Sequence, residues 1–377
     1  MTSHRLEYLD TAADVDRLLA RIASTRELAI DTEGASFHRF IDRIYLIQLS
    51  TRELNAIIDP LPVGVPARLR QLLEDPKVEI VFHDADYDLR LLHQDYGWHV
   101  RSIFDTRIAA QLLGHKSIGL AALLERYFGV RLDKKHQRAD WSMRPLTPPM
   151  LEYAVQDTAH LLDLRDRLRE ELERAGRMSW AREEFERLEG TRWDPADEAD
   201  AFLRIKGARD LDRRPLAVLR ELVAWRDGVA RHADKATFRV AANDLLLRIA
   251  ADMPRSRSEL GAMRAVPPWL RDRHGDAIIE AVKRGLAVPE SELPKFPRSA
   301  RWQRDSDYDA RVTRLRAVRD AAAQRLDLDP GVLFPRERLE AVARATPKSV
   351  DELRSVDGVR QWQSEVLGPA LVAASRE

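Results

Sequence analysis

The chain has 377 residues, of which 44% are hydrophobic and 33% are charged, and it contains no cysteine. This composition suits a globular protein of two or three domains, and the lack of cysteine excludes disulfides, thiolate zinc sites and thiol catalysis. The first residues lack the apolar core of a secretion signal, and no apolar run reaches the roughly 18 residues that span a membrane. We therefore expect a soluble, cytoplasmic protein with no membrane partner.

Basic and acidic residues balance at 62 each, but their distribution along the chain is uneven. Residues 1–200 carry a net charge of −8, residues 201–304 carry +9, and residues 305–377 carry −1. An acidic front and a basic middle suit a protein that binds cations in one part and a polyanion in another. Charge alone leaves open the alternative that this asymmetry has no function.

The first third of the chain alternates between strand and helix patterns. An amphipathic helix is predicted near 11–24, followed by strands at 27–31, 44–49, 54–59 and 78–82. Periodicity predicts further helices at 84–96, 105–113, 118–128 and 149–174. Strands followed by strand–helix alternation predict an α/β domain with a mixed sheet.

From about residue 175 onward the strand pattern disappears, and the stretches 190–200 and 287–309 have the composition of boundaries. The two helical stretches that remain resemble each other at an offset of 93 residues. A Pro-x-Ser turn occurs at Pro254 and again at Pro347, and apolar positions in the flanking helices match at the same offset. We therefore predict a duplicated helical domain, because the period is too long for a solenoid of small repeats.

The sequence Asp31-Thr32-Glu33 ends the first predicted strand. Because side chains alternate along a strand, Asp31 and Glu33 project from the same face. Two carboxylates on one face repel each other unless a cation or protons compensate, and a divalent metal would do so. The motif is common, and a strand end that enters solvent explains it equally well.

Two further acidic motifs follow. Asp84, Asp86 and Asp88 come directly after the fourth predicted strand, where Asp84 or Asp86 suits the N-cap of the next helix. Asp88 lies one turn inside that helix among leucines, and a carboxylate near a core face requires a partner. Tyr153 and Asp157 are four residues apart and share a helix face. Alone, this pair would be a packed tyrosine beside a surface aspartate.

In this order, the three motifs match the pattern of the DEDD 3′–5′ exonucleases. The tyrosine four residues before the last aspartate resembles the DEDDy subgroup; the other subgroup has a histidine at the position of Glu152. The resemblance extends to the ribonuclease D family over nearly the whole chain. It rests on residues 27–49, 83–89, 132–147 and 153–157, and on a tail that is similar to paired HRDC domains.

The resemblance implies a ribonuclease-H-like N-terminal domain with a mixed five-stranded sheet and flanking helices. It divides the chain into an exonuclease catalytic domain at 1–175, a helical linker at 176–208, and two small all-α HRDC-like domains at 209–290 and 305–377. It also implies a 3′→5′ exoribonuclease that trims structured RNA precursors with 3′ extensions, tRNA above all, and releases nucleoside 5′-monophosphates. We expect a monomer, since no coiled-coil seam is present.

The resemblance also implies roles for single residues. Two divalent ions, Mg²⁺ or Mn²⁺, would be held by four acids, namely Asp31, Glu33, Asp88 and Asp157. Glu33 and Tyr153 would position the attacking water. Hard ions prefer carboxylate oxygens, and two of them about 4 Å apart can both activate hydroxide and relieve charge on the phosphate. The neighbouring Asp84 and Asp86 leave the register of the second motif open.

Substrate contacts are expected in two loops. Phe37, His38 and Arg39 follow Glu33 and would meet the 3′-terminal nucleotides by stacking and phosphate contact. The incoming strand would meet a basic group, consisting of Lys134, Lys135, His136 and Arg138. A solvated loop is an equally good interpretation of both groups.

The basic surplus makes the first HRDC-like domain the candidate for RNA binding. Its densest basic cluster consists of Arg204, Lys206, Arg209, Arg213 and Arg214. The near-neutral second domain would instead pack against the body or close a ring around the substrate. The tryptophans of the tail, Trp225, Trp269, Trp302 and Trp362, are interpreted as core residues.

Two other functions stay open. The first is the same chemistry on DNA, because the motifs do not report how a 2′-hydroxyl is sensed. The second is a non-catalytic RNA-binding module that kept the fold, which the intact acids and Tyr153 argue against.

Overall fold

The computed structural model describes residues 6–133, 135–195, 198–297 and 307–376. The chain forms two compact units. The first comprises Met1–Gly34, Ile44–Trp193 and Trp302–Glu377, and the second comprises Ala35–Arg43 and Asp194–Arg301. Within the described ranges, every helix is too short or too polar to cross a membrane.

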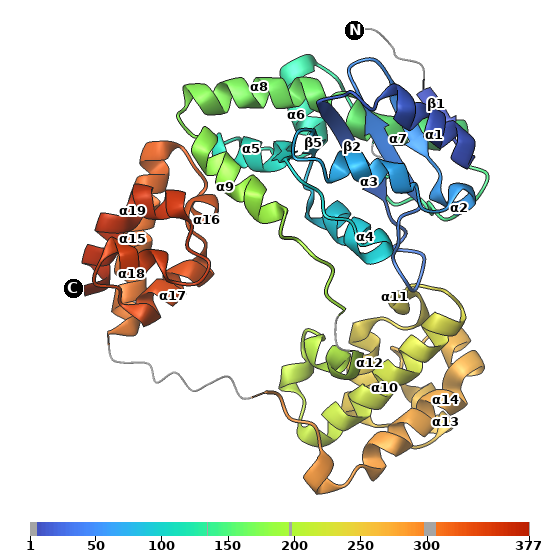
Figure 1. The fold of residues 1–377 in the computed structure, drawn as a ribbon. Coiled ribbons are helices and arrows are strands. Elements are labelled where there is room, and N and C mark those ends of the chain that lie inside the picture. Colours follow the sequence, from blue (N-terminus) through green and yellow to red (C-terminus); the bar gives the residue numbers. More distant parts are fainter. Residues whose placement is uncertain (1–5, 134, 196–197, 298–306, 377) are drawn as a thin grey trace. The chain divides into compact units, whose positions relative to one another are not determined.

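One mixed sheet forms the centre of the first unit, with the strand order β1-β4-β3-β2-β5-β6 (Figure 1). The strands are β1 (Leu6–Leu9), β2 (Glu27–Glu33), β3 (Leu46–Ser50), β4 (Asn55–Ile58), β5 (Glu79–Phe82) and β6 (Ile103–Asp105). Strands β2, β3 and β4 pair antiparallel, whereas β1, β5 and β6 add parallel pairings to this centre. The sheet therefore has six strands, and the expected number of five is wrong.

Both strands that the sequence patterns missed lie at the edges of the sheet. Strand β1 has four residues and β6 has three. Such short segments do not extend over enough residues to show the period of two that marks a strand.

Helices cover both faces of the sheet. They are α1 (Ala12–Arg21), α2 (Pro60–Val63), α3 (Ala67–Leu73), α4 (Asp86–Tyr96), α5 (Thr106–Leu112), α6 (Leu120–Phe128), α7 (Pro148–Ala159), α8 (Leu161–Arg174) and α9 (Met178–Leu188). Leu28 and Ile30 pack in a core with α1, α3 and α4, while Ala29 packs in a second core with α5, α8 and α9. Because side chains alternate along a strand, Asp31 faces the same side as Ala29. The helix predicted over 149–174 is divided at His160 into α7 and α8.

The second of the expected HRDC-like domains belongs to the same unit as the expected catalytic domain. It contains α15 (Tyr308–Leu326), α16 (Pro330–Leu333), α17 (Arg336–Ala345), α18 (Val350–Arg354) and α19 (Gln361–Arg376). The ring of Trp362 stacks on Trp180 of α9 with centroids 4.8 Å apart, and its Nε1–H donates to Glu184 at 3.1 Å. A side chain on Gly114, which follows α5, would overlap the carbonyl oxygen of Asp327. The second domain therefore packs against the catalytic body.

The first of the expected HRDC-like domains forms the second unit together with residues 35–43. Its helices are α10 (Arg213–His232), α11 (Thr237–Val240), α12 (Asn243–Asp252), α13 (Arg257–Ala262) and α14 (Pro268–Ala287). The last four begin at 237, 243, 257 and 268, and their counterparts α16 to α19 begin at 330, 336, 350 and 361, a constant offset of 93. The predicted duplication is thus confirmed.

Candidate active site

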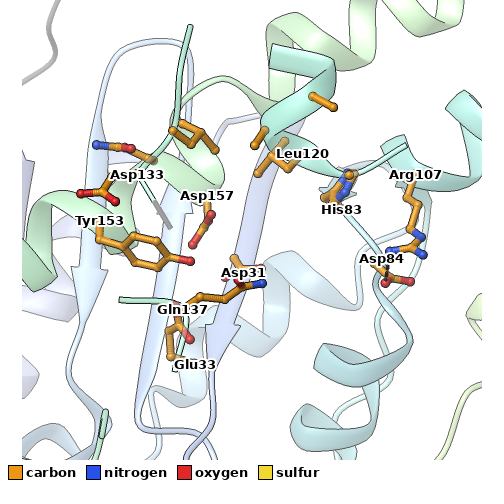
Figure 2. A pocket seen from close by; sticks show the side chains of 15 residues that line it. Asp31, Glu33, His83, Asp84, Arg107, Leu120, Asp133, Gln137, Tyr153 and Asp157 are labelled. Carbon is orange, nitrogen blue, oxygen red and sulfur yellow. Dashed lines mark hydrogen bonds and ion pairs between the residues drawn. The ribbon is translucent and has the colours of Figure 1, made fainter. Parts of the chain in front are cut away.

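A pocket of about 430 Å³ opens beside the end of β2. Figure 2 shows Asp31 and Glu33 of β2 and Tyr153 and Asp157 of α7 gathered at one end of this pocket, with His83 at the other. Helix α7 packs against β2, β3 and β4, so its Tyr–Asp face is turned toward the strand that carries the Asp-x-Glu motif. Motifs about 120 residues apart in the chain therefore share one cavity.

The carboxylates of this site lie within reach of a common ion. One oxygen each from Asp31, Glu33 and Asp157 lies within 4.8 Å of the other two. Asp88 of α4 is buried beside them, where its Oδ1 accepts hydrogen bonds from the backbone N–H of Thr32 at 2.9 Å and from the Thr32 hydroxyl at 2.6 Å. Thr32 lies between Asp31 and Glu33, so these bonds hold α4 against the middle of the motif.

Burial makes the charged form of these acids unfavourable. It raises the pKa of Asp31 well above its usual range, and the negative charges of Asp88, Asp157 and Glu33 raise it further. Burial raises the pKa of Asp157 to about 7. Burial also raises the pKa of Asp88 to about 7, although the hydrogen bonds from Thr32 oppose this shift. A cluster of this kind needs protons or a cation, and its all-oxygen donor set fits a hard divalent ion.

Tyr153 is held in place by two rings. The ring centroids of Trp141 and His136 each lie 6.0 Å from that of Tyr153. Burial raises the pKa of Tyr153 above its ordinary value, and the carboxylates of Asp157 and Glu33 add to the shift. The hydroxyl therefore stays protonated, and it is suited to orient a water molecule rather than to act as a strong base.

Arg144 anchors the segment between α6 and α7, a role that the sequence did not reveal. Its Nη2 donates to Oδ1 of Asp59 at 2.7 Å and to the carbonyl of Tyr45 at 2.9 Å. Its Nη1 donates to the carbonyl of Trp141 at 2.7 Å. The side chain of Asp59 is 1% exposed and that of Arg144 is 23% exposed, so this ion pair is largely buried, and it fixes Trp141 behind Tyr153.

Gln48 is a second residue that the sequence did not single out for a role. It lies directly across from Asp31 in the β2–β3 register and is fully buried. Neither its amide nitrogen nor its amide oxygen has a hydrogen-bond partner among the described residues. Buried polar groups usually have a partner or an ordered water, so this orphan amide fits a hydrated ion beside Asp31. The signal in the sequence was one polar residue inside an otherwise apolar strand.

The three aspartates near the start of α4 have different partners. Asp84 pairs with Arg107 at 2.9 Å and Asp86 pairs with Arg90 at 2.7 Å, and both carboxylates are exposed. Only Asp88 is buried against the Asp-x-Glu motif. The N-cap expected from Asp84 or Asp86 is wrong, because Ala85 occupies that position without a side-chain cap.

The residues expected to contact the substrate are not gathered in the pocket as the acids are. Of the segment before α7, Leu132, Asp133 and Gln137 line the pocket, whereas the exposed Lys135 and Arg138 are not part of its wall as far as the structure describes it. Lys134 lies outside the described residues. The other expected loop, with Phe37, His38 and Arg39, belongs to the second unit, which contains the first HRDC-like domain.

His83 and Arg107, which line the far end of the pocket, are additions to the predicted site. The Nδ1 of His83 lies 2.9 Å from the Thr106 hydroxyl. Burial, together with the positive charge of Arg107, lowers the pKa of His83 to about 4. This imidazole is therefore neutral at physiological pH.

Comparisons with known proteins agree with this geometry. Residues 6–173 match the family model described as a 3′-5′ exonuclease, and residues 216–282 and 309–374 each match the HRDC domain. Ribonuclease D of Nitrobacter hamburgensis is 30% identical over 371 residues, which cover 98% of this chain and 94% of the relative. Ribonuclease D of Pseudomonas paraeruginosa is 31% identical over 354 residues, or 92% and 91% of the two chains.

A solved structure extends the likeness to the whole fold. The crystal structure of Escherichia coli RNase D, described as an exoribonuclease involved in structured RNA processing, superposes with a TM-score of 0.76 at 26% identity. The match covers 100% of this chain and 99% of that one. The chain therefore belongs to the ribonuclease D family and is a 3′–5′ exoribonuclease with two HRDC domains.

Proposed function

We propose that this exoribonuclease shortens RNA one nucleotide at a time at a centre of two divalent metal ions, Mg²⁺ or Mn²⁺. Asp31, Glu33, Asp88 and Asp157 would hold the ions. The observation that carries this proposal is the convergence of three carboxylate oxygens within 4.8 Å in an open pocket. The fourth acid is tied to the same strand through Thr32.

The residues of the chain divide the work between charge and orientation. Two bound ions would stabilise the charge that develops on the scissile phosphate and on the leaving oxygen. The buried carboxylates supply the negative charge that retains such ions at this point. The protonated hydroxyl of Tyr153, together with Glu33, orients the attacking water, and Trp141 keeps the tyrosine ring in position.

The proposed substrates are structured RNA precursors with 3′ extensions, including those of tRNA, and the enzyme acts as a monomer. Support comes from the description of Escherichia coli RNase D as an enzyme of structured RNA processing. It also comes from the net charge of +9 on residues 201–304, which include the first HRDC domain, since a basic surface favours a polyanion.

A time course on a tRNA-like RNA, labelled at its 5′ end and extended at its 3′ end, tests this proposal. In Mg²⁺ or Mn²⁺ we expect a ladder that shortens one nucleotide at a time and is lost in EDTA and in Asp88→Asn. Asp86→Asn is the matched control, because Asp86 lies on the same helix but is exposed and paired with Arg90. The control should keep its activity.

Two results would revise the proposal. Activity in Asp88→Asn together with inactivity in Asp86→Asn would shift the ligand assignment by two positions. A ladder on a matched DNA oligomer, without one on RNA, would replace the RNA substrate by DNA.

A further inference from the structure

The first HRDC domain carries a pocket of about 510 Å³ with an unusual lining. It is formed by residues of α10, α11, α14 and the turn between α10 and α11. Its aromatic and basic residues include Trp225, His232, Lys235, Arg239, Trp269 and Arg273. No aspartate or glutamate is part of the wall among the residues that the structure describes. We call this cavity the Trp269 pocket.

The aromatic side chains of the Trp269 pocket are open to a ligand. Trp269 was interpreted from the sequence as a core residue, but its side chain is 54% exposed, so that interpretation is wrong. Trp225 is half-buried, and its Nε1 atom is inaccessible to solvent and has no hydrogen-bond partner within the described part of the chain. The pocket therefore offers one exposed flat aromatic surface, that of Trp269.

Two of the cations of the pocket, Lys235 and Arg273, are also available. Lys235 and Arg273 are exposed, and neither side chain makes an ion pair or hydrogen bond with another described residue. The cluster that the sequence favoured for RNA behaves differently. Arg213 donates to the carbonyl of Leu293 at 2.8 Å, and Arg214 donates to that of Leu286 at 3.0 Å. Those two guanidinium groups bind carbonyls of the last turn of α14 and of the chain beyond it, and they are already occupied.

In the second HRDC domain, the equivalent face carries different residues and has a different environment. At the offset of 93, Trp269 corresponds to Trp362, which is 2% exposed because it stacks on Trp180 of the catalytic domain. Three basic positions of the pocket, Lys235, Arg239 and Arg273, correspond to Leu328, Val332 and Val366. Leu328 and Val332 line a cavity together with Gly114 and Ile118 of the catalytic domain.

This internal comparison separates two uses of one surface. In the second copy the face is apolar and contacts protein, whereas in the first copy it combines cations with an exposed indole. Cations beside flat aromatic rings are the features that bind a single-stranded nucleic acid, whose bases stack and whose phosphates are negative.

We propose that the Trp269 pocket binds one nucleotide of single-stranded RNA, with the base against Trp269 and the backbone phosphate on Lys235 and Arg273. This inference rests on the proposed function, in which RNA is the substrate. The pocket is also joined to the segment that follows Glu33 in the sequence, because Arg239 donates to the carbonyl of Phe37 at 2.5 Å.

Fluorescence anisotropy with a labelled 20-nucleotide oligo(A) tests the proposal, in EDTA so that the RNA is not consumed. Trp269→Leu should weaken binding about tenfold, which is within the range for the loss of one base stack. Trp269→Phe should stay close to the wild type because it retains an aromatic ring. The double variant Lys235→Ala/Arg273→Ala should reduce the slope of log Kd against log salt by about 1.4, or about 0.7 for each phosphate contact.

Two controls separate the pocket from the active site and from folding. Lys283→Ala removes an exposed lysine of α14 that pairs with Glu280 and is not in the pocket, so it should leave affinity unchanged. Hydrolysis of a dinucleotide, which is too short to need the pocket, should have the wild-type rate in every variant.

Three outcomes would overturn the inference. The first is a wild-type enzyme that degrades RNA while Trp269→Leu and the double variant bind oligo(A) normally; the proposed function would then stand. The second is a pocket that binds polyglutamate and does not bind RNA, which would make it a site for an acidic protein. The third is a wild type that neither binds nor degrades RNA, which would remove the proposed function as well.

Discussion

For each buried carboxyl group of the active site, burial costs less free energy in the protonated form than in the ionised form. The folded-state pKa values of Asp88 and Asp157 lie near 7, above the ordinary value of 3.8. Between these values the folded protein binds more protons than the unfolded chain, so its stability falls as pH rises. At high pH, where the protons are lost, a bound metal ion would neutralise the carboxylates instead.

From this we expect metal-free protein to lose stability as pH rises from about 4 through about 7, and Mg²⁺ to restore it chiefly above pH 7. Asp157→Asn should make the pH dependence shallower in EDTA and raise the stability at pH 8, while activity is lost. Urea unfolding at pH 5 and pH 8, with and without EDTA, measures this. An equally steep dependence in Asp157→Asn would contradict the prediction.

Tyr153→Phe removes one hydroxyl and leaves the ring contacts with Trp141 and His136 in place. We expect kcat to fall about 100-fold, at the lower end of what a positioned proton-bearing group contributes, with KM nearly unchanged. Steady-state kinetics on a short RNA give both constants. A loss of less than about threefold would show that the hydroxyl has no part in orienting water.

Local spacing explains which site residues could be found in the sequence. The strand period places Asp31 with Glu33, and the helix period places Tyr153 with Asp157, without knowledge of the rest of the chain. Arg144 escaped because its partner Asp59 is 85 positions away. Gln48 was not predicted, because its lack of a hydrogen-bond partner depends on which elements pack over β3. No local sequence pattern contains that information.

At the level of elements, the ion pair between Arg144 and Asp59 ties the segment between α6 and α7 to the sheet domain. Removing one partner of a buried pair leaves the other charge in a dry environment, so Arg144→Ala should lower the free energy of unfolding by about 3 kcal/mol. It should also lower kcat, because Trp141 loses its tether behind Tyr153. Urea unfolding checks the first effect, with Arg144→Lys as a partial replacement. A loss below about 1 kcal/mol would mean that water reaches Asp59.

Elements were predictable where they were long or strongly periodic. The patterns located β2 to β5 and most helices of the catalytic domain. They missed β1 and β6, whose four and three residues show no period, and they joined α7 to α8 across His160 because the apolar stripe continues through it. The start of α4 differed for another reason. The backbone N–H groups of Asp84 and Ala85, just before the helix, donate to the distant Asp105 at 3.2 and 2.7 Å, a contact that no local pattern contains.

At the scale of the whole molecule, the two HRDC domains put equivalent tryptophans to different uses. Trp362→Ala removes a fully buried indole and should lower stability by about 4 kcal/mol, as large core truncations do. Trp269→Ala should change stability by no more than about 0.5 kcal/mol, because most exposed positions tolerate substitution. Thermal and urea unfolding of both variants tests this. Equal losses would mean that Trp269 is covered in solution.

The duplication itself was visible in the sequence, because an offset of 93 residues repeats across several helices and a capped turn. Ser256 accepts from the N–H of Glu259, and Ser349 accepts from that of Glu352. The charge difference between the copies was visible too, and it led to the expectation that the near-neutral second copy packs against the body or closes a ring. The residues that meet the catalytic domain were not visible, since that contact depends on the three-dimensional fold.

The grouping of residues 35–43 with the first HRDC domain bears on how such enzymes can be recombined. An HRDC domain looks like a cassette that could be exchanged between nucleases at its two ends. Here nine residues from inside the catalytic sequence belong to the cassette, held by contacts such as the bond from Ala236 N–H to the carbonyl of His38 at 3.2 Å. A chimera that takes residues 194–301 alone would leave those nine residues without their native surroundings. A transplant that also carries residues 35–43 would preserve their contacts. The two segments should therefore be exchanged together.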